Sequence, residues 1–263
     1  MPYTTYKRKE LHYTDHGKGD PIVLLHGFTE DLRIWKQFSD RLSKNYRVVC
    51  IDLPGHGKSE CLSEVHTMEI LADSVYAVIK QLKLKKCLMI GHSMGGYVSL
   101  AFASKHPGAL KGFGLFHSHC YADTPDDKRN RTRTIEVVKK DRFGFLSMFI
   151  PGLFPEESRK KFSKEIDFLM WCAREIPHEG IVAALKGMLE RKDQTALLKA
   201  TKLPVLFILG LKDSKAPALK LWDMISLPAV SETLILRECG HMGYIEAPEI
   251  TLKTVRNFAR SVF

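Results

Sequence analysis

Short apolar runs alternate with amphipathic segments through the first half of the chain. The runs have the length of buried strands and cover residues 11–15, 21–25, 46–51, 86–90 and 110–116. Two of the intervening segments, residues 31–42 and 67–82, carry their apolar side chains at helical spacing. Strands that alternate with helices in this way predict an α/β fold, with a mostly parallel central sheet and helices on both faces.

The alternation stops between residues 120 and 197. Three segments there, starting at Pro125, Pro155 and Pro177, place a proline and acidic residues in a first helical turn. Beyond them the pattern resumes, with strands predicted at 205–209 and 233–236 and helices at 218–224 and 248–263. We therefore predict one α/β core, formed by residues 1–119 and 198–263, with a helical cap inserted at residues 120–197.

The composition is typical of a soluble globular protein. Of the 263 residues, 44% are hydrophobic and 27% are charged, which allows a sizeable core. No apolar run approaches the length of about 20 residues that a membrane span needs, and the first residues show no apolar secretion signal. The six cysteines lack metal-binding spacing, so we expect reduced thiols, no bound metal and a cytoplasmic location.

The formal net charge is +10, which raises the question of a nucleic-acid partner. The densest basic stretch, residues 128–142, is interrupted by acidic residues, and no nucleic-acid-binding motif accompanies it. We therefore predict a solvated helix face there and no nucleic-acid or membrane partner. A weaker expectation is that Arg131 and Arg133 contact substrates that bear a carboxylate.

The strongest chemical signal is the sequence GHSMGG at residues 91–96. It lies between a predicted buried strand and a helix-forming stretch, as in the G-x-S-x-G turn that exposes a nucleophilic serine. The residues two before and two after the serine crowd each other in such a turn, and here they are Gly91 and Gly95. We predict that Ser93 is a nucleophile beside the free N–H groups of a helix N-terminus.

A serine nucleophile needs a base and an acid that orients the base. In an α/β core such groups lie in loops at the carboxyl ends of strands. Asp213 follows the strand at 205–209 and His241 follows the last predicted strand, so we predict Asp213 as the acid and His241 as the base. Asp123, which follows the strand at 110–116, remains an alternative acid.

Other polar residues near strand ends have simpler explanations. His26 and His92 are expected to order the loop and the turn beside the site, and Asp52 to stabilise a turn. His117 and His119 follow a strand end and either line the pocket or pack in the core. Cys239 is expected to be a buried thiol. For the oxyanion hole we predict two backbone donors, the N–H groups of Phe28 and Met94.

These motifs together resemble those of the α/β-hydrolase family over nearly the whole chain. The matching segments are His26-Gly27-Phe28, DLPGHGKS at 52–59, GHSMGG at 91–96, Gly210 with Asp213, and Gly240-His241. The resemblance implies hydrolysis through an acyl-enzyme, a mobile helical cap over the site, and no cofactor or metal.

Departures from particular branches of this family narrow the chemistry. Ser93 stands where haloalkane dehalogenases and epoxide hydrolases have aspartate, and His92 where carbon–carbon bond hydrolases of the meta-cleavage type usually have asparagine. Tyr97 replaces the arginine of menaquinone-pathway synthases. Phe28 and Met94 stand where cofactor-free haloperoxidases and prolyl aminopeptidases, respectively, favour tryptophan. A carboxylesterase, followed by an enol-lactonase, fits what remains.

We therefore expect a serine hydrolase acting on a small or medium carboxylic ester. Hydrolysis of a lactone or a carbon–carbon bond by the same triad is an alternative, and a small-molecule receptor on the same fold is a further one. The residues predicted to line the substrate pocket are His117, Phe143, Phe145, Met148, Phe149, Phe154, Trp171 and Met242.

Overall fold

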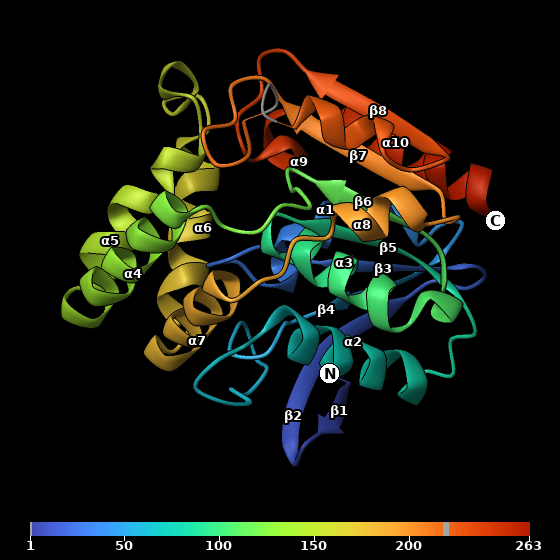
Figure 1. The fold of residues 1–263 in the computed structure, drawn as a ribbon, viewed down its shortest axis with the longest axis horizontal. Coiled ribbons are helices and arrows are strands. Elements are labelled where there is room, and N and C mark those ends of the chain that lie inside the picture. Colours follow the sequence, from blue (N-terminus) through green and yellow to red (C-terminus); the bar gives the residue numbers. More distant parts are fainter. Residues whose placement is uncertain (1, 218–220) are drawn as a thin grey trace.

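The computed structural model describes residues 2–217 and 221–263. At its centre lies an eight-stranded sheet with the strand order β1-β2-β4-β3-β5-β6-β7-β8 (Figure 1). The strands are β1 Tyr3–Tyr6, β2 Lys9–His16, β3 Pro21–Leu25, β4 Arg47–Ile51, β5 Cys87–His92, β6 Leu110–Phe116, β7 Val205–Gly210 and β8 Ser231–Leu236. The strands from β4 to β8 in this order pair in parallel, which confirms the predicted mostly parallel sheet.

An antiparallel hairpin of β1 and β2 forms one edge of the sheet. The sequence predicted β2 but missed β1. Lys7 and Arg8, the two residues of the turn, both have positive φ, at 50° and 65°. A two-residue hairpin turn of this kind normally carries asparagine or glycine, so the usual sequence signal is absent.

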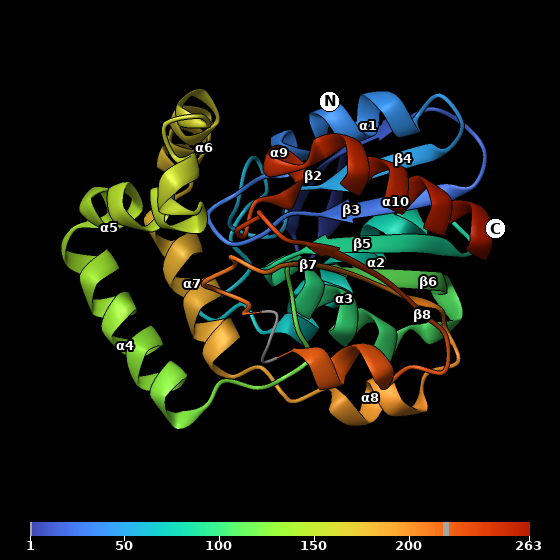
Figure 2. The same cartoon turned by 90° about the horizontal axis from the view of Figure 1, so that it is seen from above.

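Helices cover both faces of the sheet. Figure 2 shows α1 (Lys36–Leu42), α9 (Gly243–Glu246) and α10 (Pro248–Val262) on one side. On the other side lie α2 (Met68–Gln81), α3 (Met94–Lys105) and α8 (Thr195–Ala200). All residues of β5 and β7 are buried, as expected for parallel strands covered on both faces.

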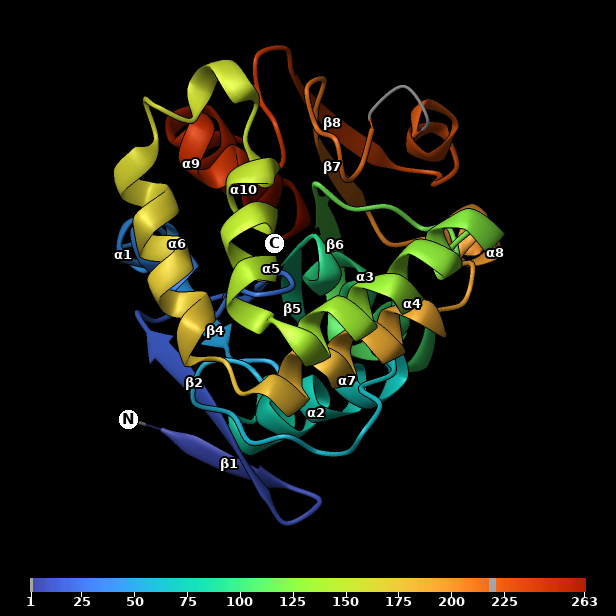
Figure 3. The same cartoon turned by 90° about the vertical axis from the view of Figure 1, so that its left-hand side faces the viewer.

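The segment between β6 and β7 forms helices beyond the carboxyl ends of the strands (Figure 3). They are α4 (Pro125–Lys140), α5 (Arg142–Phe149), α6 (Ser163–Glu175) and α7 (His178–Leu189), with α4 packed on α7 and α5 on α6. Residue 197, the predicted end of the insertion, falls inside α8, which lies with the core helices instead.

Two further findings concern helices. The helix predicted at 218–224 lies partly outside the described residues, and Trp222–Ser226 forms a short 3₁₀ helix. Among the described residues, none of the helices combines the length and apolar character required to cross a membrane.

Candidate active site

Ser93 occupies a strained turn between β5 and α3. Its φ of 50° and ψ of −115° lie outside the regions that non-glycine residues favour. A Cβ on Gly91 would lie 2.1 Å from the carbonyl oxygen of Gly95, and a Cβ on Gly95 would lie 2.6 Å from that of Leu25. Larger residues at positions 91 and 95 would therefore displace the backbone that presents the serine.

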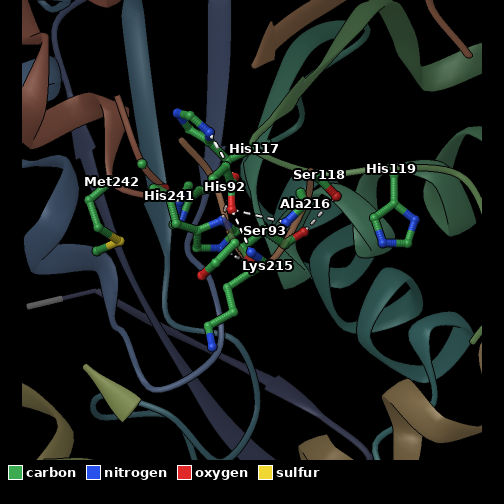
Figure 4. Close-up of polar contacts among 12 residues, drawn as sticks. His92, Ser93, His117, Ser118, His119, Lys215, Ala216, His241 and Met242 are labelled. Atoms are coloured by element: carbon green, nitrogen blue, oxygen red, sulfur yellow. Dashed lines mark hydrogen bonds and ion pairs between the residues drawn. The ribbon is translucent and has the colours of Figure 1, made fainter. Parts of the chain in front are cut away.

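The structure brings Ser93, His241 and Asp213 into one hydrogen-bonded chain. Figure 4 shows Ser93 and His241 within this site. The Nε2 atom of His241 lies 2.9 Å from the Oγ atom of Ser93, and its Nδ1 atom lies 2.8 Å from the Oδ2 atom of Asp213. Asp213 lies in the loop after β7 and His241 in the loop after β8. This arrangement allows the imidazole to accept the hydroxyl proton while the carboxylate fixes its tautomer.

Four donors surround the carboxylate of Asp213. Its Oδ1 atom accepts hydrogen bonds from the backbone N–H groups of Lys215 and Ala216, at 2.8 and 2.9 Å, and its Oδ2 atom faces His117 and His241. Burial acts to raise the pKa of Asp213, but the attraction of His241 and the hydrogen bonds from both imidazoles outweigh it. They hold the pKa well below its ordinary value, so the acid is ionised.

His117 was predicted to line the pocket, and this was wrong. It is buried behind Asp213, with its Nδ1 atom 3.1 Å from Oδ2 and its Nε2 atom without a partner in the described part of the chain. Burial lowers its pKa to about 4, so the ring is neutral near pH 7. Because a carboxylate only accepts, the Nδ1 atom of His117 carries the proton.

The two predicted oxyanion donors lie beside the nucleophile. Met94 is the first residue of α3, and Phe28 lies in the loop after β3. Both residues are buried. Within the described residues, neither backbone N–H takes part in a protein hydrogen bond, so both are free to bind a developing oxyanion.

A cavity of about 810 Å³ opens onto Ser93 and His241. Its lining includes the rings of Phe28, Phe145 and Phe149. Phe28 and Phe149 meet edge to face at 5.6 Å, and Phe145 and Phe149 stack at 5.1 Å between centroids. Phe145 and Phe149 were predicted to line the pocket, and both are among its lining residues.

Other predicted lining residues point away from the cavity. Phe143 and Met148, both on α5, are 52% and 80% exposed and are not among the lining residues. The ring of Trp171, 52% exposed, lies 4.4 Å from the guanidinium of Arg33. Phe154 and Met242 are buried in the protein core and are not among the residues that line the cavity.

Other lining residues of the cavity are polar. They include Tyr97, His119, Asp123, Arg131 and Arg191. Asp123 accepts hydrogen bonds from Arg131 at 2.7 and 3.1 Å and pairs with Arg191 at 2.5 Å. Both of its oxygens are therefore engaged by arginine. Within the described residues the carboxylate that contacts His241 is that of Asp213, not Asp123.

The sequence did not single out several of these cavity residues. Arg191 lies over the ring of Tyr97 at 4.3 Å, and Lys215 lies 5.2 Å from the ring centroid of Phe149. Nothing in their local sequence marks them, because the fold alone brings them together. Arg133, predicted beside Arg131 as a substrate contact, is exposed and outside the lining, since successive helical residues face different directions.

The other polar residues named from the sequence lie outside the triad, and two of them hydrogen-bond to loop backbone. The Nε2 atom of His26 accepts a hydrogen bond from the Leu53 N–H, and Asp52 accepts from the N–H groups of Leu32 and Lys58. The thiol of Cys239 is buried, and burial raises its pKa, so it is not a reactive thiolate.

In the described part of the chain, one group of side chains has the donors and spacing to hold a metal ion. His117, Asp213 and His241 each offer a ligand atom, and these atoms lie within 4.8 Å of one another. Both imidazole Nδ1 atoms already hydrogen-bond the carboxylate, so a metal would have to displace those contacts.

Comparisons with known proteins agree with this fold. A family model described as alpha/beta hydrolase fold matches residues 20–131. The chain is 30% identical to a 2-hydroxy-6-oxononadienedioate/2-hydroxy-6-oxononatrienedioate hydrolase of Escherichia coli O81, over 96% of this chain and 91% of that protein. It is 34% identical to a thermophilic esterase from Thermogutta terrifontis, with a TM-score of 0.92, covering 97% of this chain and 94% of that one.

A third relative is longer than this chain. The chain is 29% identical to the dihydrolipoyllysine-residue acetyltransferase component of the acetoin cleaving system of Pseudomonas putida, over 92% of this chain. It spans 64% of the length of that protein.

Proposed function

Because this chain belongs to the α/β-hydrolase family, we propose that it is a serine hydrolase that cleaves a small or medium carboxylic ester through an acyl-enzyme. The observation that carries this proposal is the contact between His241 Nε2 and Ser93 Oγ at 2.9 Å, at the floor of an open cavity. A hydroxyl held against a base in this way is an activated nucleophile.

The reaction follows from the positions of these side chains. Ser93 attacks the ester carbonyl as His241 takes its proton, and the N–H groups of Phe28 and Met94 bind the oxyanion. His241 then gives the proton to the leaving alcohol. Water, activated by the same imidazole, cleaves the acyl-enzyme and releases the acid. Asp213 stabilises the imidazolium at each step.

We assign helices α4 to α7 the role of a cap over the site. Phe145 and Phe149 come from α5 and Met188 from α7, and all three line the cavity. Side chains of these helices would therefore contact the acyl or alcohol group and exclude water from it. The unpaired cysteines fit our expectation of a reducing, cytoplasmic setting.

The test is covalent labelling together with turnover. A fluorophosphonate probe should label Ser93, as located by mass spectrometry, and Ser93→Ala should abolish both labelling and hydrolysis of p-nitrophenyl esters. Ser147→Ala, which changes an exposed serine on α5, is the matched control and should retain both. Labelling at another residue, or full activity in Ser93→Ala, would reject the proposal.

The polar wall of the cavity supports a second candidate, hydrolysis of a lactone or a carbon–carbon bond by the same triad. Tyr97, Arg131 and Arg191 offer donors that a simple alkyl ester does not need. A panel that includes lactones and 2-hydroxy-6-oxo-dienoates would distinguish the two. A kcat/KM at least tenfold higher for one of these than for any simple ester would favour the second candidate.

A further inference from the structure

Two buried side chains, Glu30 and His92, form a pair beneath the candidate active site. The Nδ1 atom of His92 lies 2.9 Å from the Oε2 atom of Glu30. The exposed fraction is 1% for His92 and 2% for Glu30. The catalytic steps described above do not use either side chain, although His92 directly precedes Ser93 in the sequence.

The other nitrogen of His92 contacts the proposed base. Its Nε2 atom lies 2.9 Å from the backbone carbonyl oxygen of His241. A carbonyl oxygen only accepts, and so does an ionised carboxylate, so both ring nitrogens of His92 must donate. Burial acts to lower the pKa of His92, but the attraction of Glu30 outweighs it and raises that pKa. Burial acts to raise the pKa of Glu30, but the attraction of His92 outweighs it and lowers that pKa. Both shifts favour an imidazolium paired with a carboxylate.

Glu30 reaches the loop that carries the first oxyanion donor. Its Oε2 atom accepts a hydrogen bond of 2.5 Å from the backbone N–H of Gly27, the residue before Phe28. Its Oε1 atom accepts another, of 2.9 Å, from the hydroxyl of Tyr244. A Cβ on Gly27 would lie 2.7 Å from the Glu30 carboxylate and 2.9 Å from the His92 ring. The absence of a side chain at Gly27 therefore allows Glu30 and His92 to approach the backbone of this loop closely.

We propose that Glu30 and His92 are positioning residues that join the oxyanion loop to the loop of the base. The contact of Glu30 with the Gly27 N–H fixes Gly27 and thereby the N–H of Phe28. The contact of His92 Nε2 with the His241 carbonyl fixes the backbone of His241. The pair thus holds the donor and the base at a set separation. This inference rests on the proposed serine hydrolase function.

A buried ion pair is weak evidence for a role in stability alone. Removing two charges from water costs several kcal/mol per ion, and an apolar pair of similar volume often stabilises a protein as well or better. The contacts of Glu30 and His92 instead connect segments that are far apart in sequence, residues 27–30 and 241–244. The placement of the oxyanion donor relative to the base affects the energy of the transition state most, because the donors act there.

Two amide substitutions of His92 separate its contacts. The side-chain amide of asparagine occupies about the position of Nδ1, so His92→Asn keeps a donor toward Glu30 and loses the one to His241. The amide of glutamine reaches about the position of Nε2, so His92→Gln keeps the contact to His241 and loses the one to Glu30. Glu30→Gln keeps the size of the carboxylate and removes its charge.

We expect each of these variants to lower kcat for a p-nitrophenyl ester at least about tenfold while KM changes less than about twofold, because the lost interaction acts in the transition state. The rate of fluorophosphonate labelling at Ser93 should fall in parallel. Tyr244→Phe removes a single hydrogen bond to Glu30 and leaves the packing intact, so it should fold and lower kcat by about threefold.

The matched control is a second histidine–carboxylate pair away from the site. His106 Nε2 lies 3.1 Å from Asp73, between α2 and α3. His106→Gln and Asp73→Asn should leave kcat and KM unchanged. Values of kcat within twofold of wild type in His92→Asn, His92→Gln and Tyr244→Phe, with Ser93 still labelled, would overturn the positioning role and leave the proposed function standing. Failure of Ser93 labelling in the wild type would instead overturn the function itself.

Discussion

The Nδ1 atom of His117 lies 3.1 Å from the Oδ2 atom of Asp213. The same carboxylate oxygen accepts the hydrogen bond from the proposed base, so two imidazoles share one acceptor. A second donor to a carboxylate stabilises its charged form. His117 therefore acts on the base through the acid that orients it.

The first prediction concerns this second imidazole. We expect His117→Ala to lower kcat/KM about tenfold, because a hydrogen bond to a charged group contributes about 1.5–3 kcal/mol. His117→Asn should stay within about twofold of wild type. Asparagine keeps a donor near the Nδ1 position and tolerates the φ of 50° found at residue 117. Steady-state kinetics on both variants test this, and wild-type kcat/KM in His117→Ala would contradict it.

The second prediction separates the acid from its rival. Asp213→Asn should lower kcat by about 10⁴-fold, because the amide favours the wrong tautomer of His241. Asp123→Asn should change kcat much less but destabilise the fold by about 3–5 kcal/mol, since it weakens the pairing with the buried Arg191 and the partly buried Arg131. Kinetics and urea unfolding of both variants make the comparison. A severe loss of kcat in a stably folded Asp123→Asn variant would show that the acid is misassigned.

That Ser93, Asp213 and His241 lie together could be predicted because each position obeys a local or topological rule. Gly91 and Gly95 are needed wherever a serine sits in such a turn, so the nucleophile can be read from adjacent residues. Asp213 and His241 follow strands whose carboxyl ends meet at one edge of the sheet. These constraints act within a few residues of the motif and need no knowledge of side-chain packing.

The cavity and its supporting residues depend on packing between distant segments. The sequence of α5 does not say which face meets the core, so Met148 and Phe149 looked equally suitable as lining residues. Trp171 packs on Arg33, from a segment far away in the chain. Glu30 carries no motif, and its contacts to His92 and Tyr244 exist only once the loop after β3, the end of β5 and α9 have come together.

The third prediction follows from the corrected cavity. Phe149→Ala should change the discrimination between butyrate and octanoate esters, because the Phe149 ring lines the cavity. The ratio of their kcat/KM values should shift by a factor that corresponds to about 1–3 kcal/mol. Met148→Ala is the matched control on the same helix, since Met148 is 80% exposed. Trp171→Ala should likewise keep the wild-type ratio. An equal shift in Met148→Ala and Phe149→Ala would mean that the cavity is not the acyl site.

The fourth prediction concerns metals. We expect ester hydrolysis to continue at the wild-type rate after exhaustive dialysis against EDTA, because the proposed steps use a serine, an imidazole and backbone donors. The cluster of His117, Asp213 and His241 makes this a real test, since it offers three potential ligands. Loss of activity on chelation, restored by a divalent cation, would contradict the proposed chemistry.

The fifth prediction is the effect of acid on stability. His66 is buried, its Nε2 atom accepts a hydrogen bond of 3.1 Å from the Leu62 N–H, and burial lowers its pKa to about 4. In the unfolded chain a histidine titrates near pH 6.5. Between these values the unfolded state binds the additional proton, so the free energy of unfolding falls as pH decreases from about 6.5 to about 4.

His66→Gln should remove this dependence and keep the fold, since the glutamine oxygen replaces Nε2 as the acceptor for Leu62. At pH 7 the variant should be close to wild type. At pH 4.5 it should recover up to about 3 kcal/mol of the stability that the wild type loses. Urea unfolding at both pH values measures the difference, with His106→Gln, at a partly exposed histidine, as the control. If wild type and His66→Gln lose the same free energy of unfolding between pH 7 and 4.5, then His66 is not held neutral in the folded protein.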